Sequence, residues 1–216
     1  VGKEPTSATL FDIDNDGDMD ISGCFSTEGV IVWWQNSDGS GDSFQEHIIE
    51  NLTPGVSAIG NADLDRDGDI DFVASIETTG EISWWENSDG SATTLVKHPI
   101  VNSGPGITGL QILDIDKDGD LDILCISTGT SSVTWWENAD GTGSNWTSHT
   151  ISNSITGINL ITHADMDSDG DLDIVTASAS TGVLSWWENL DGAGGSWLDH
   201  EISALYSGIS SVQTSD

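Results

Sequence analysis

The sequence predicts an all-β protein, a β-propeller built from four 51-residue blades of four strands each. Three observations support this fold class. The motif D-x-D-x-D-G-D-x-D occurs four times, and its copies begin 51 residues apart, at Asp12, Asp63, Asp114 and Asp165. Short runs of strand-forming residues flank each copy, and no stretch shows helical apolar spacing over three turns. A period of about 40–50 residues with four strands is typical of a propeller blade.

The second repeat illustrates the elements that we expect in each blade. Strand-forming runs alternate with turn residues, and Pro99 in the last run is typical of an edge strand because proline has no amide donor. In chain order the expected elements are a strand at 56–59, the acidic motif from Asp63, and strands at 71–76, 81–85 and 95–100, with turns at 78–80 and 87–90. The acidic motif is therefore expected between the first two strands of a blade.

The repeats fill nearly the whole chain, so we expect one repeat array over residues 1–216 without a separate second domain. The tail from Gly208 repeats the segment that precedes each internal acidic motif, and we expect residues 206–216 to form an extra inner strand. Whether the four blades close a ring or belong to a larger propeller stays open. The expected blades span approximately residues 6–50, 56–101, 106–152 and 157–203.

Each acidic motif is predicted to bind one calcium ion, which gives about four ions in all. Five carboxylates within nine residues repel one another strongly unless a cation lies among them. Oxygen donors at alternate positions, followed by a glycine turn, suit a hard cation such as Ca²⁺. We expect positions 1, 3, 5 and 9 of the motif to donate side-chain oxygens, and position 7 to donate its backbone carbonyl. The candidate metal residues are Asp12, Asp14, Asp16, Asp18, Asp20, Asp63, Asp65, Asp67, Asp69, Asp71, Asp114, Asp116, Asp118, Asp120, Asp122, Asp165, Asp167, Asp169, Asp171 and Asp173.

The chain is strongly acidic, with 37 Asp and Glu residues against 4 Lys and Arg residues and a formal charge of −33. Four bound divalent ions would reduce this charge to −25. Such a surface repels nucleic acid and anionic lipid, and no apolar run approaches the ~18 residues that a membrane span needs. We therefore expect neither a nucleic-acid partner nor insertion into a membrane.

The two cysteines, Cys24 and Cys125, do not occupy equivalent positions in their repeats. A disulfide framework places its cysteines at regular spacings, and this pair shows none. We therefore expect two buried free thiols.

Tryptophan and histidine recur in the same register as the acidic motif. Adjacent strand residues point to opposite faces, so each Trp pair is expected to present one ring to each neighbouring blade. Trp146 and Trp197 are less regular and are candidates for exposed rings that stack on sugars. The histidines are expected to be packing or surface groups on outer strands. These residues are the Trp pairs at 33/34, 84/85, 135/136 and 186/187, and His47, His98, His149 and His200.

The acidic loops and the 51-residue repeats resemble the calcium-binding repeats of FG-GAP/VCBS-type β-propellers, the class found in integrin alpha-subunit propellers and many secreted microbial proteins. The resemblance covers essentially the whole chain and rests on four phased copies of the loop. The literal Phe-Gly and Gly-Ala-Pro motifs are absent, so the sequence is similar to the VCBS-like branch. The resemblance implies that the loop joins a blade's first two strands, that the ion is structural, and that members commonly have seven blades.

We expect a secreted or cell-surface calcium-binding propeller that serves as a structural, adhesive or self-assembling module. Weak calcium sites, with dissociation constants of order 10⁻⁴–10⁻³ M, suit extracellular modules. The expected partners are other protein subunits, recruited through the terminal strand, or glycans. Because some fungal lectins share this repeat, a lectin-like domain that uses exposed Trp is the alternative; the propeller domain of a polysaccharide-processing enzyme is less favoured. No nucleophile motif, phosphate-binding glycine loop or histidine-rich metal site is present, so the sequence predicts a protein that is not an enzyme.

Overall fold

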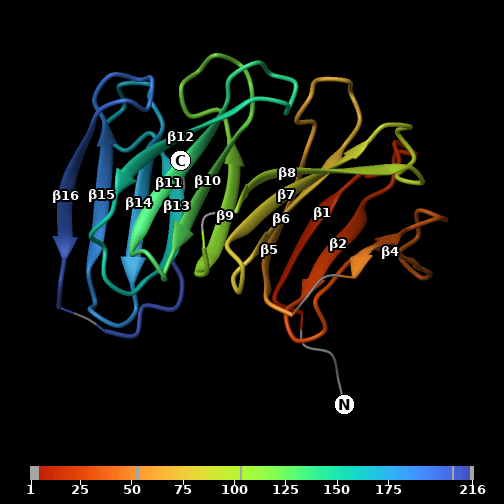
Figure 1. Cartoon of the computed structure of the whole chain (residues 1–216), viewed down its shortest axis with the longest axis horizontal. Coiled ribbons are helices and arrows are strands. Elements are labelled where there is room, and N and C mark those ends of the chain that lie inside the picture. Colours follow the sequence, from red (N-terminus) through yellow and green to blue (C-terminus); the bar gives the residue numbers. More distant parts are fainter. Residues whose placement is uncertain (1–4, 52–53, 103, 206, 215–216) are drawn as a thin grey trace. The chain divides into compact units, whose positions relative to one another are not determined.

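The computed structural model describes residues 5–51, 54–102, 104–205 and 207–214. Their regular structure consists of β-strands, β1 to β16, arranged in four antiparallel sheets of four strands each (Figure 1). None of the described residues lies in a helix long and apolar enough to cross a membrane. The predicted all-β class with four four-stranded blades is therefore confirmed.

The contacts within the chain divide it into two compact units. The first unit comprises residues 1–110 together with 141–144, and the second comprises residues 111–140 together with 145–216. Each unit contains its own apolar core. The single repeat array that we expect over residues 1–216 stays a prediction.

The strands of every sheet are hydrogen-bonded in chain order, each to its neighbour along the sequence. The first sheet contains β1 (Ser7–Phe11), β2 (Asp20–Phe25), β3 (Val30–Gln35) and β4 (Gln45–Asn51). The second sheet contains β5 (Val56–Ala62), β6 (Asp71–Ile76), β7 (Glu81–Asn87) and β8 (Leu95–Asn102). The third sheet contains β9 (Ile107–Leu113), β10 (Asp122–Ser127), β11 (Ser132–Asn138) and β12 (Trp146–Ser152). The fourth sheet contains β13 (Ile158–Ala164), β14 (Asp173–Ser178), β15 (Leu184–Asn189) and β16 (Trp197–Ser203).

The acidic loop joins the first two strands of each sheet, as predicted. The residue before the loop pairs across the sheet with the last aspartate of the motif, which is also the first residue of the next strand. This pairing closes the loop at its base, in the pairs Phe11–Asp20, Ala62–Asp71 and Ala164–Asp173. The sheet thereby fixes both ends of a loop whose carboxylates repel one another.

The core of each unit consists of aliphatic residues packed against tryptophan. In the first unit, Trp33, Phe72 and Trp85 pack with buried aliphatic side chains such as Ile31 and Val56. In the second unit, a similar cluster is formed by Trp135, Trp187, Leu124, Ile158 and Ile174. Burial of these large side chains is the main favourable term in the folding of each unit.

The two members of a Trp pair point in opposite directions, as strand geometry predicts. Within the first unit, Trp84 Nε1 donates a hydrogen bond of 3.2 Å to the carbonyl of Gly143. The adjacent Trp85 Nε1 donates one of 3.0 Å to Glu50 Oε2 on β4. One ring therefore contacts the preceding repeat and the other contacts the hairpin loop of the following repeat.

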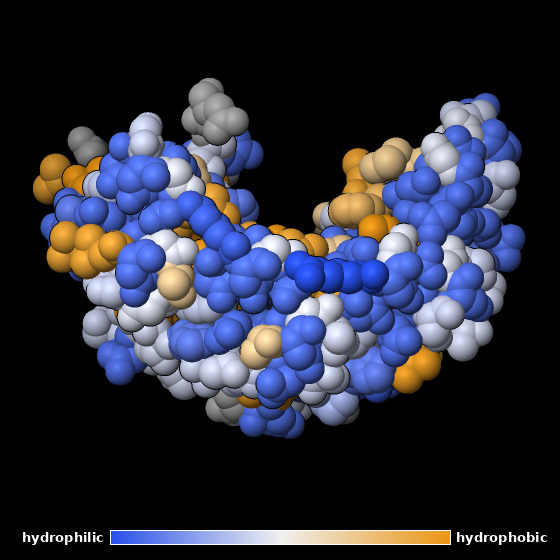
Figure 2. All heavy atoms as spheres, turned by 90° about the horizontal axis from the view of Figure 1, so that it is seen from above, coloured by the Kyte–Doolittle hydropathy of each residue, from blue (hydrophilic) through white to orange (hydrophobic). Residues whose placement is uncertain are grey.

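The face of the protein drawn in Figure 2 is mainly hydrophilic, and hydrophobic residues interrupt it in separate patches. None of the ten tryptophans is among the exposed hydrophobic residues, and Trp146 and Trp197 are half-buried. Trp197 packs against the core of the second unit and donates a hydrogen bond of 2.8 Å to the carbonyl of Gly194. Neither ring is fully exposed, and the expectation that these two positions stack on sugars stays a prediction.

The extra strand expected at residues 206–216 is not formed. Residues 207–214 contain no strand, and positions 206, 215 and 216 lie outside the described residues. In the other repeats, the matching segment pairs with the strand that follows the acidic loop. In the fourth sheet the described residues 207–214 pair with no strand. Individual hydrogen bonds hold this segment instead. For example, the amide of Gly208 donates a hydrogen bond of 2.7 Å to the carbonyl of Ala179.

Both cysteines are buried and free, as predicted. Burial raises the pKa of the Cys24 thiol to about 11 and that of Cys125 to about 12. The thiols therefore stay protonated at neutral pH and behave as small apolar side chains.

We predict that truncating the buried Phe72 destabilises the first unit. Phe72 is 0% exposed, and its loss to alanine leaves a cavity in the core. The substitution Phe72→Ala should lower the free energy of unfolding by about 3–5 kcal/mol, as measured by urea denaturation. Val96→Ala is the control, since Val96 is 42% exposed and its loss should cost no more than about 0.5 kcal/mol. Equal effects of the two substitutions would contradict this description of the core.

Candidate metal centre

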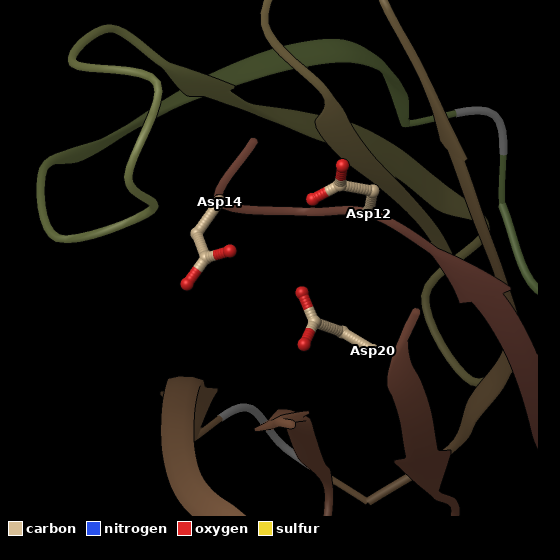
Figure 3. A group of neighbouring side chains, drawn as sticks. All are labelled: Asp12, Asp14 and Asp20. Carbon is tan, nitrogen blue, oxygen red and sulfur yellow. The ribbon is translucent and has the colours of Figure 1, made fainter. Parts of the chain in front are cut away.

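Three carboxylates of each acidic loop converge on one point. In the first loop, Asp12, Asp14 and Asp20 point toward one another (Figure 3), and one oxygen of each lies within 4.8 Å of the others. Ligands on opposite sides of a cation with oxygen distances of 2.3–2.6 Å lie about 4.6–5.2 Å apart, so this spacing fits such a cation. The same positions converge in the other loops, as Asp63, Asp65 and Asp71; Asp114, Asp116 and Asp122; and Asp165, Asp167 and Asp173.

A glycine turn and the loop's own amides orient these carboxylates. Gly17 has a φ of +94°, which glycine adopts without steric cost, and its amide donates a hydrogen bond of 3.0 Å to Asp12 Oδ2. The amide of Asp16 likewise donates to Asp14 Oδ1 at 3.3 Å. The glycines of the other three loops have φ values of 93–96°, and these loops repeat both hydrogen bonds. The backbone therefore sets the direction of the first two carboxylates before any ion binds.

The last aspartate of the motif is buried and accepts two backbone hydrogen bonds. Asp71 Oδ2 accepts from the amide of Leu64 at 2.9 Å, and its Oδ1 accepts from the amide of Asn87 at 2.9 Å. This one side chain therefore connects the loop to the end of the third strand, β7. Asp20, Asp122 and Asp173 make the same pair of bonds in their repeats.

The remaining two aspartates of each motif lie outside the three-carboxylate groups. At position 5, Asp16 Oδ1 accepts a hydrogen bond of 2.9 Å from the amide of Asp18, and the other three loops repeat this bond. At position 7, Asp69 Oδ1 accepts from Asn15 Nδ2 at 2.9 Å, and Asp171 forms an ion pair with Lys117. In the second and fourth repeats, position 7 thus connects its loop to the preceding loop. Of the side chains predicted as ligands, the structure brings together positions 1, 3 and 9.

Unsatisfied oxygens show that the three-carboxylate groups suit a cation. Oδ1 of Asp12, Asp63 and Asp114 is buried and accepts no hydrogen bond. A buried carboxylate oxygen without a partner is costly, and a bound cation would remove that cost. Each repeat therefore holds an aspartate group that can bind a metal ion.

The protonation of the buried aspartates depends on their surroundings. Burial raises the pKa of Asp71 and of Asp122 to about 7, from an ordinary value of 3.8, and nearby carboxylates of the same loop add to this effect. The two backbone hydrogen bonds oppose the shift without cancelling it. Burial also raises the pKa of Asp65 and Asp116. In the absence of a cation, the fold therefore retains protons at these sites.

A fourth polar residue beside each group was missed in the sequence analysis. It follows the Trp pair on the third strand and is Gln35 in the first repeat, then Glu86, Glu137 and Glu188. Gln35 Nε2 donates a hydrogen bond to Asp14 Oδ2. The negative charge of Glu86 contributes, after burial and the neighbouring Asp67, to the raised pKa of Asp65. The sequence contained a signal for this residue. A Gln or Glu recurs after each Trp pair, in WWQN and WWEN, and alternate strand residues point to the same face.

Each of these residues is in turn held by the recurrent histidine on the outer strand. His98 Nε2 lies 2.8 Å from Glu86 Oε2, and its ring stacks on Trp84 with 4.6 Å between centroids. The other repeats contain the same stack and the same polar contact, at His47, His149 and His200. The histidines are therefore packing groups on outer strands, as predicted, and they also position the Gln or Glu side chain beside the metal group.

Comparison with known proteins identifies related repeats and folds. A family model described as an FG-GAP-like repeat matches residues 12–74, 63–125 and 114–176. No curated protein matches the sequence. Among solved structures, a protein from Lactobacillus plantarum is 13% identical with a TM-score of 0.61, over 96% of this chain and 59% of that one. A Bacteroides uniformis protein, provisionally described as a 6-phosphogluconolactonase, is 12% identical with a TM-score of 0.58, over 95% of this chain and 56% of that one.

These structural likenesses establish a propeller-like fold and correct one expectation. The chain spans less than two thirds of the length of both structures. One of the two similar structures is described as an enzyme, so this fold also occurs in a protein with an enzyme's description. The prediction that this chain is not an enzyme is therefore wrong. It was based on the absence of familiar catalytic motifs, and that absence does not distinguish this chain from a protein of similar fold that is described as an enzyme.

We predict that the cation-free protein loses stability as the pH rises from about 4 to about 7. The folded pKa of Asp71 and Asp122, about 7, lies above the unfolded value, so the folded state binds more protons in this range. The stabilising effect is complete below the unfolded pKa and is lost as the pH passes through 7. Thermal unfolding in chelator, followed by circular dichroism at constant ionic strength, should show a falling melting temperature. A melting temperature that rises over this range would contradict the assignment.

Proposed function

The chain belongs to the FG-GAP-like repeat family, and on this premise we propose that it is a secreted calcium-binding module with a structural or adhesive role. The observation that carries the proposal is the group of three converging aspartates in each of the four repeats. The ion would hold each loop and would thereby stabilise the sheet to which the loop belongs. The partners of such a module would be other protein subunits or glycans outside the cell.

The ligand set supports calcium as the ion. Every converging donor is a carboxylate oxygen, and hard cations prefer oxygen. Neither sulfur nor imidazole, which softer transition metals favour, belongs to any of the groups formed by the described residues. Calcium also accepts more ligands and a less regular geometry than magnesium, which suits a loop that can add backbone carbonyls and water.

The partial exposure of the sites supports an extracellular setting. Of the three aspartates in each group, only the last is buried, and the other two are half-buried or exposed. Open loops of this kind bind calcium weakly, with dissociation constants of order 10⁻⁴–10⁻³ M in extracellular modules. Such sites fill where calcium is plentiful. The acidic surface keeps the module soluble and prevents binding to nucleic acid.

Glycan binding has less support as a second function. It depended on exposed tryptophan rings, and all ten rings are buried or half-buried. The groove beside Trp33 and His47, with a volume of about 690 Å³, is lined mainly by strand and hairpin residues of the first unit. The Trp33 ring in this groove is 1% exposed and stacks on His47, so it presents no open aromatic platform. Protein partners are therefore the better supported class.

We predict that calcium raises the melting temperature and that the converging aspartates carry this effect. A site filled at 100 times its dissociation constant contributes about 2.7 kcal/mol to the free energy of unfolding. Asp65→Asn and Asp116→Asn together should remove a large part of the calcium-induced shift in differential scanning calorimetry. Asp199→Asn on β16 is the control, because it removes a carboxylate outside the loops. No shift on adding calcium to the chelated wild type would refute calcium as the ion.

We predict that the glutamates after the Trp pairs strengthen calcium binding. The triple variant Glu86→Gln, Glu137→Gln and Glu188→Gln gives every repeat the amide that the first repeat already has at Gln35. Residues that surround metal ligands commonly change affinity about 10- to 100-fold, so calorimetric titration should show at least about tenfold weaker binding at three sites. Gln35→Glu is the matched reverse change and should tighten the first site. Unaltered affinities in both variants would show that this position plays no part in binding.

A further inference from the structure

In the second repeat, an ammonium group lies beside the second Trp of the pair. Lys97 on β8 is opposite Trp85 on β7, and its Nζ lies over that ring, 5.2 Å from the centroid. The same Nζ forms ion pairs of 3.3 Å with Glu50 Oε2 and 3.0 Å with Glu81 Oε1. An aromatic ring and two carboxylates therefore bind this cation.

In the fourth repeat, the matching place carries carboxylates instead. Asp199 on β16 takes the position of Lys97 and lies opposite Trp187 on the neighbouring strand β15 (Figure 1). Glu201 lies opposite Ser185, and because it is two residues from Asp199 it belongs to the same face of the sheet. Neither acid forms an ion pair within the part of the chain that the structure describes.

These residues line a pocket with a volume of about 300 Å³. The pocket lies between the third and fourth repeats and within the second unit, since its wall also includes residues 154–156, which join the two repeats. Its volume is at the lower end of the range of about 300–1,000 Å³ for ligand sites, so it suits one long side chain or a small ligand. The polar and aromatic groups of its wall belong to Ser154, Thr156, Ser185, Trp187, Asp199 and Glu201.

A buried hydroxyl in the wall indicates that the pocket suits a hydrogen-bond donor. Ser185 is 4% exposed, and its Oγ makes no hydrogen bond with the described residues. At the same position of the second repeat, Ser83 Oγ donates a hydrogen bond of 2.8 Å to Glu81 Oε1, whereas the fourth repeat has Val183 in place of Glu81. A buried hydroxyl without a partner is costly, and a ligand that donates to Ser185 would remove that cost.

We propose that this pocket binds an alkylammonium group, borne by a lysine side chain of a partner protein or by a free amine. An ammonium group has three donors, for which Asp199, Glu201 and Ser185 offer acceptors, and Trp187 supplies an aromatic wall. The class of ligand follows from the second repeat, where the ammonium of Lys97 takes the matching place. This proposal deepens the proposed function by naming the chemistry of the partner, and it rests on that function only for the extracellular setting.

The test is a titration of the 216-residue protein, followed by NMR at the indole N–H signal of Trp187, in calcium and at physiological salt. The probe is the peptide acetyl-Gly-Lys-Gly-amide, and it should shift this signal until the site is saturated. The same peptide with an acetylated lysine side chain should bind at least about tenfold more weakly, since acetylation removes the charge. Cadaverine, a free diamine, distinguishes the two sources: tighter binding of the peptide assigns the site to a partner's lysine, and tighter binding of cadaverine assigns it to a free amine.

Two variants change the pocket without touching the core, because Asp199 and Glu201 are exposed. The double variant Asp199→Asn and Glu201→Gln keeps the shape of both side chains and should weaken binding of the lysine peptide by at least about tenfold. Asp199→Lys gives the fourth repeat an ammonium group of its own, as Lys97 does in the second repeat, and should abolish binding. Glu28→Gln, which removes an exposed carboxylate from the first unit, is the matched control and should bind as the wild type does.

Three results would overturn the proposal. They are a Trp187 signal that no amine shifts, equal binding of the free and the acetylated lysine peptide, and wild-type affinity in the double variant. Displacement of the peptide by calcium at constant ionic strength would also overturn it, because the pocket would then be a metal site. Counting the calcium ions bound by the same samples keeps the two proposals separate, since failure of lysine binding with unchanged calcium binding leaves the proposed function standing.

Discussion

The burial of one aspartate in each repeat is the constraint on which the rest of the blade depends. Asp20, Asp71, Asp122 and Asp173 are buried at the base of the acidic loop, where a lone carboxylate is expensive. Two backbone amides, one from the loop and one from the end of the third strand, compensate part of that cost. A cation among the three carboxylates would compensate the rest. The loop, the first hairpin and the third strand are therefore held together at this aspartate. The charge at the aspartate group determines how much this connection stabilises the blade.

The same arrangement explains why the tryptophans and the loops recur in one register. Asn87, whose amide binds the buried Asp71, also directs its side chain to the carbonyls of Ile13 and Ile70, and its Oδ1 accepts the amide of Ala92. It thus fixes the hairpin loop that covers the tryptophan of the preceding repeat. A residue beside the metal group therefore also shapes the contact between repeats. Loss of the ion would therefore weaken the contact between repeats as well as the loop.

The sequence was sufficient for the fold because the repeat removes ambiguity. Four aligned copies show the same strands, turns and loop, and the structure places β6 at the predicted residues 71–76. The converging aspartates were predicted within a larger set. Positions 5 and 7 do not converge because the turn through Asn15 and Gly17, both at positive φ, directs Asp16 to an amide and Asp18 away from the group. Side-chain direction in such a turn depends on backbone angles that spacing alone does not determine.

Two other features required the structure for a similar reason. Glu86 lies 15 residues after Asp71 in sequence and reaches the metal group only because β6 and β7 pair. The tail from Gly208 matches the strand-forming segment of the other repeats, but a strand also needs a partner, and pairing is a property of the sheet rather than of the segment. The sequence predicted that each Trp pair presents one ring to each neighbouring repeat. It did not predict that the first ring contacts the hairpin loop of the next repeat, because that contact depends on the loop geometry at Gly143 and Gly194.

The most direct test of the central claim is the number of calcium ions bound per chain. The protein should be equilibrated with calcium, and native mass spectrometry should count the ions that remain. The four converging groups predict four ions per chain, and three after Asp114→Asn and Asp116→Asn disable one group. A wild type that binds no calcium, or a variant that still binds four ions, would contradict the assignment of these aspartates.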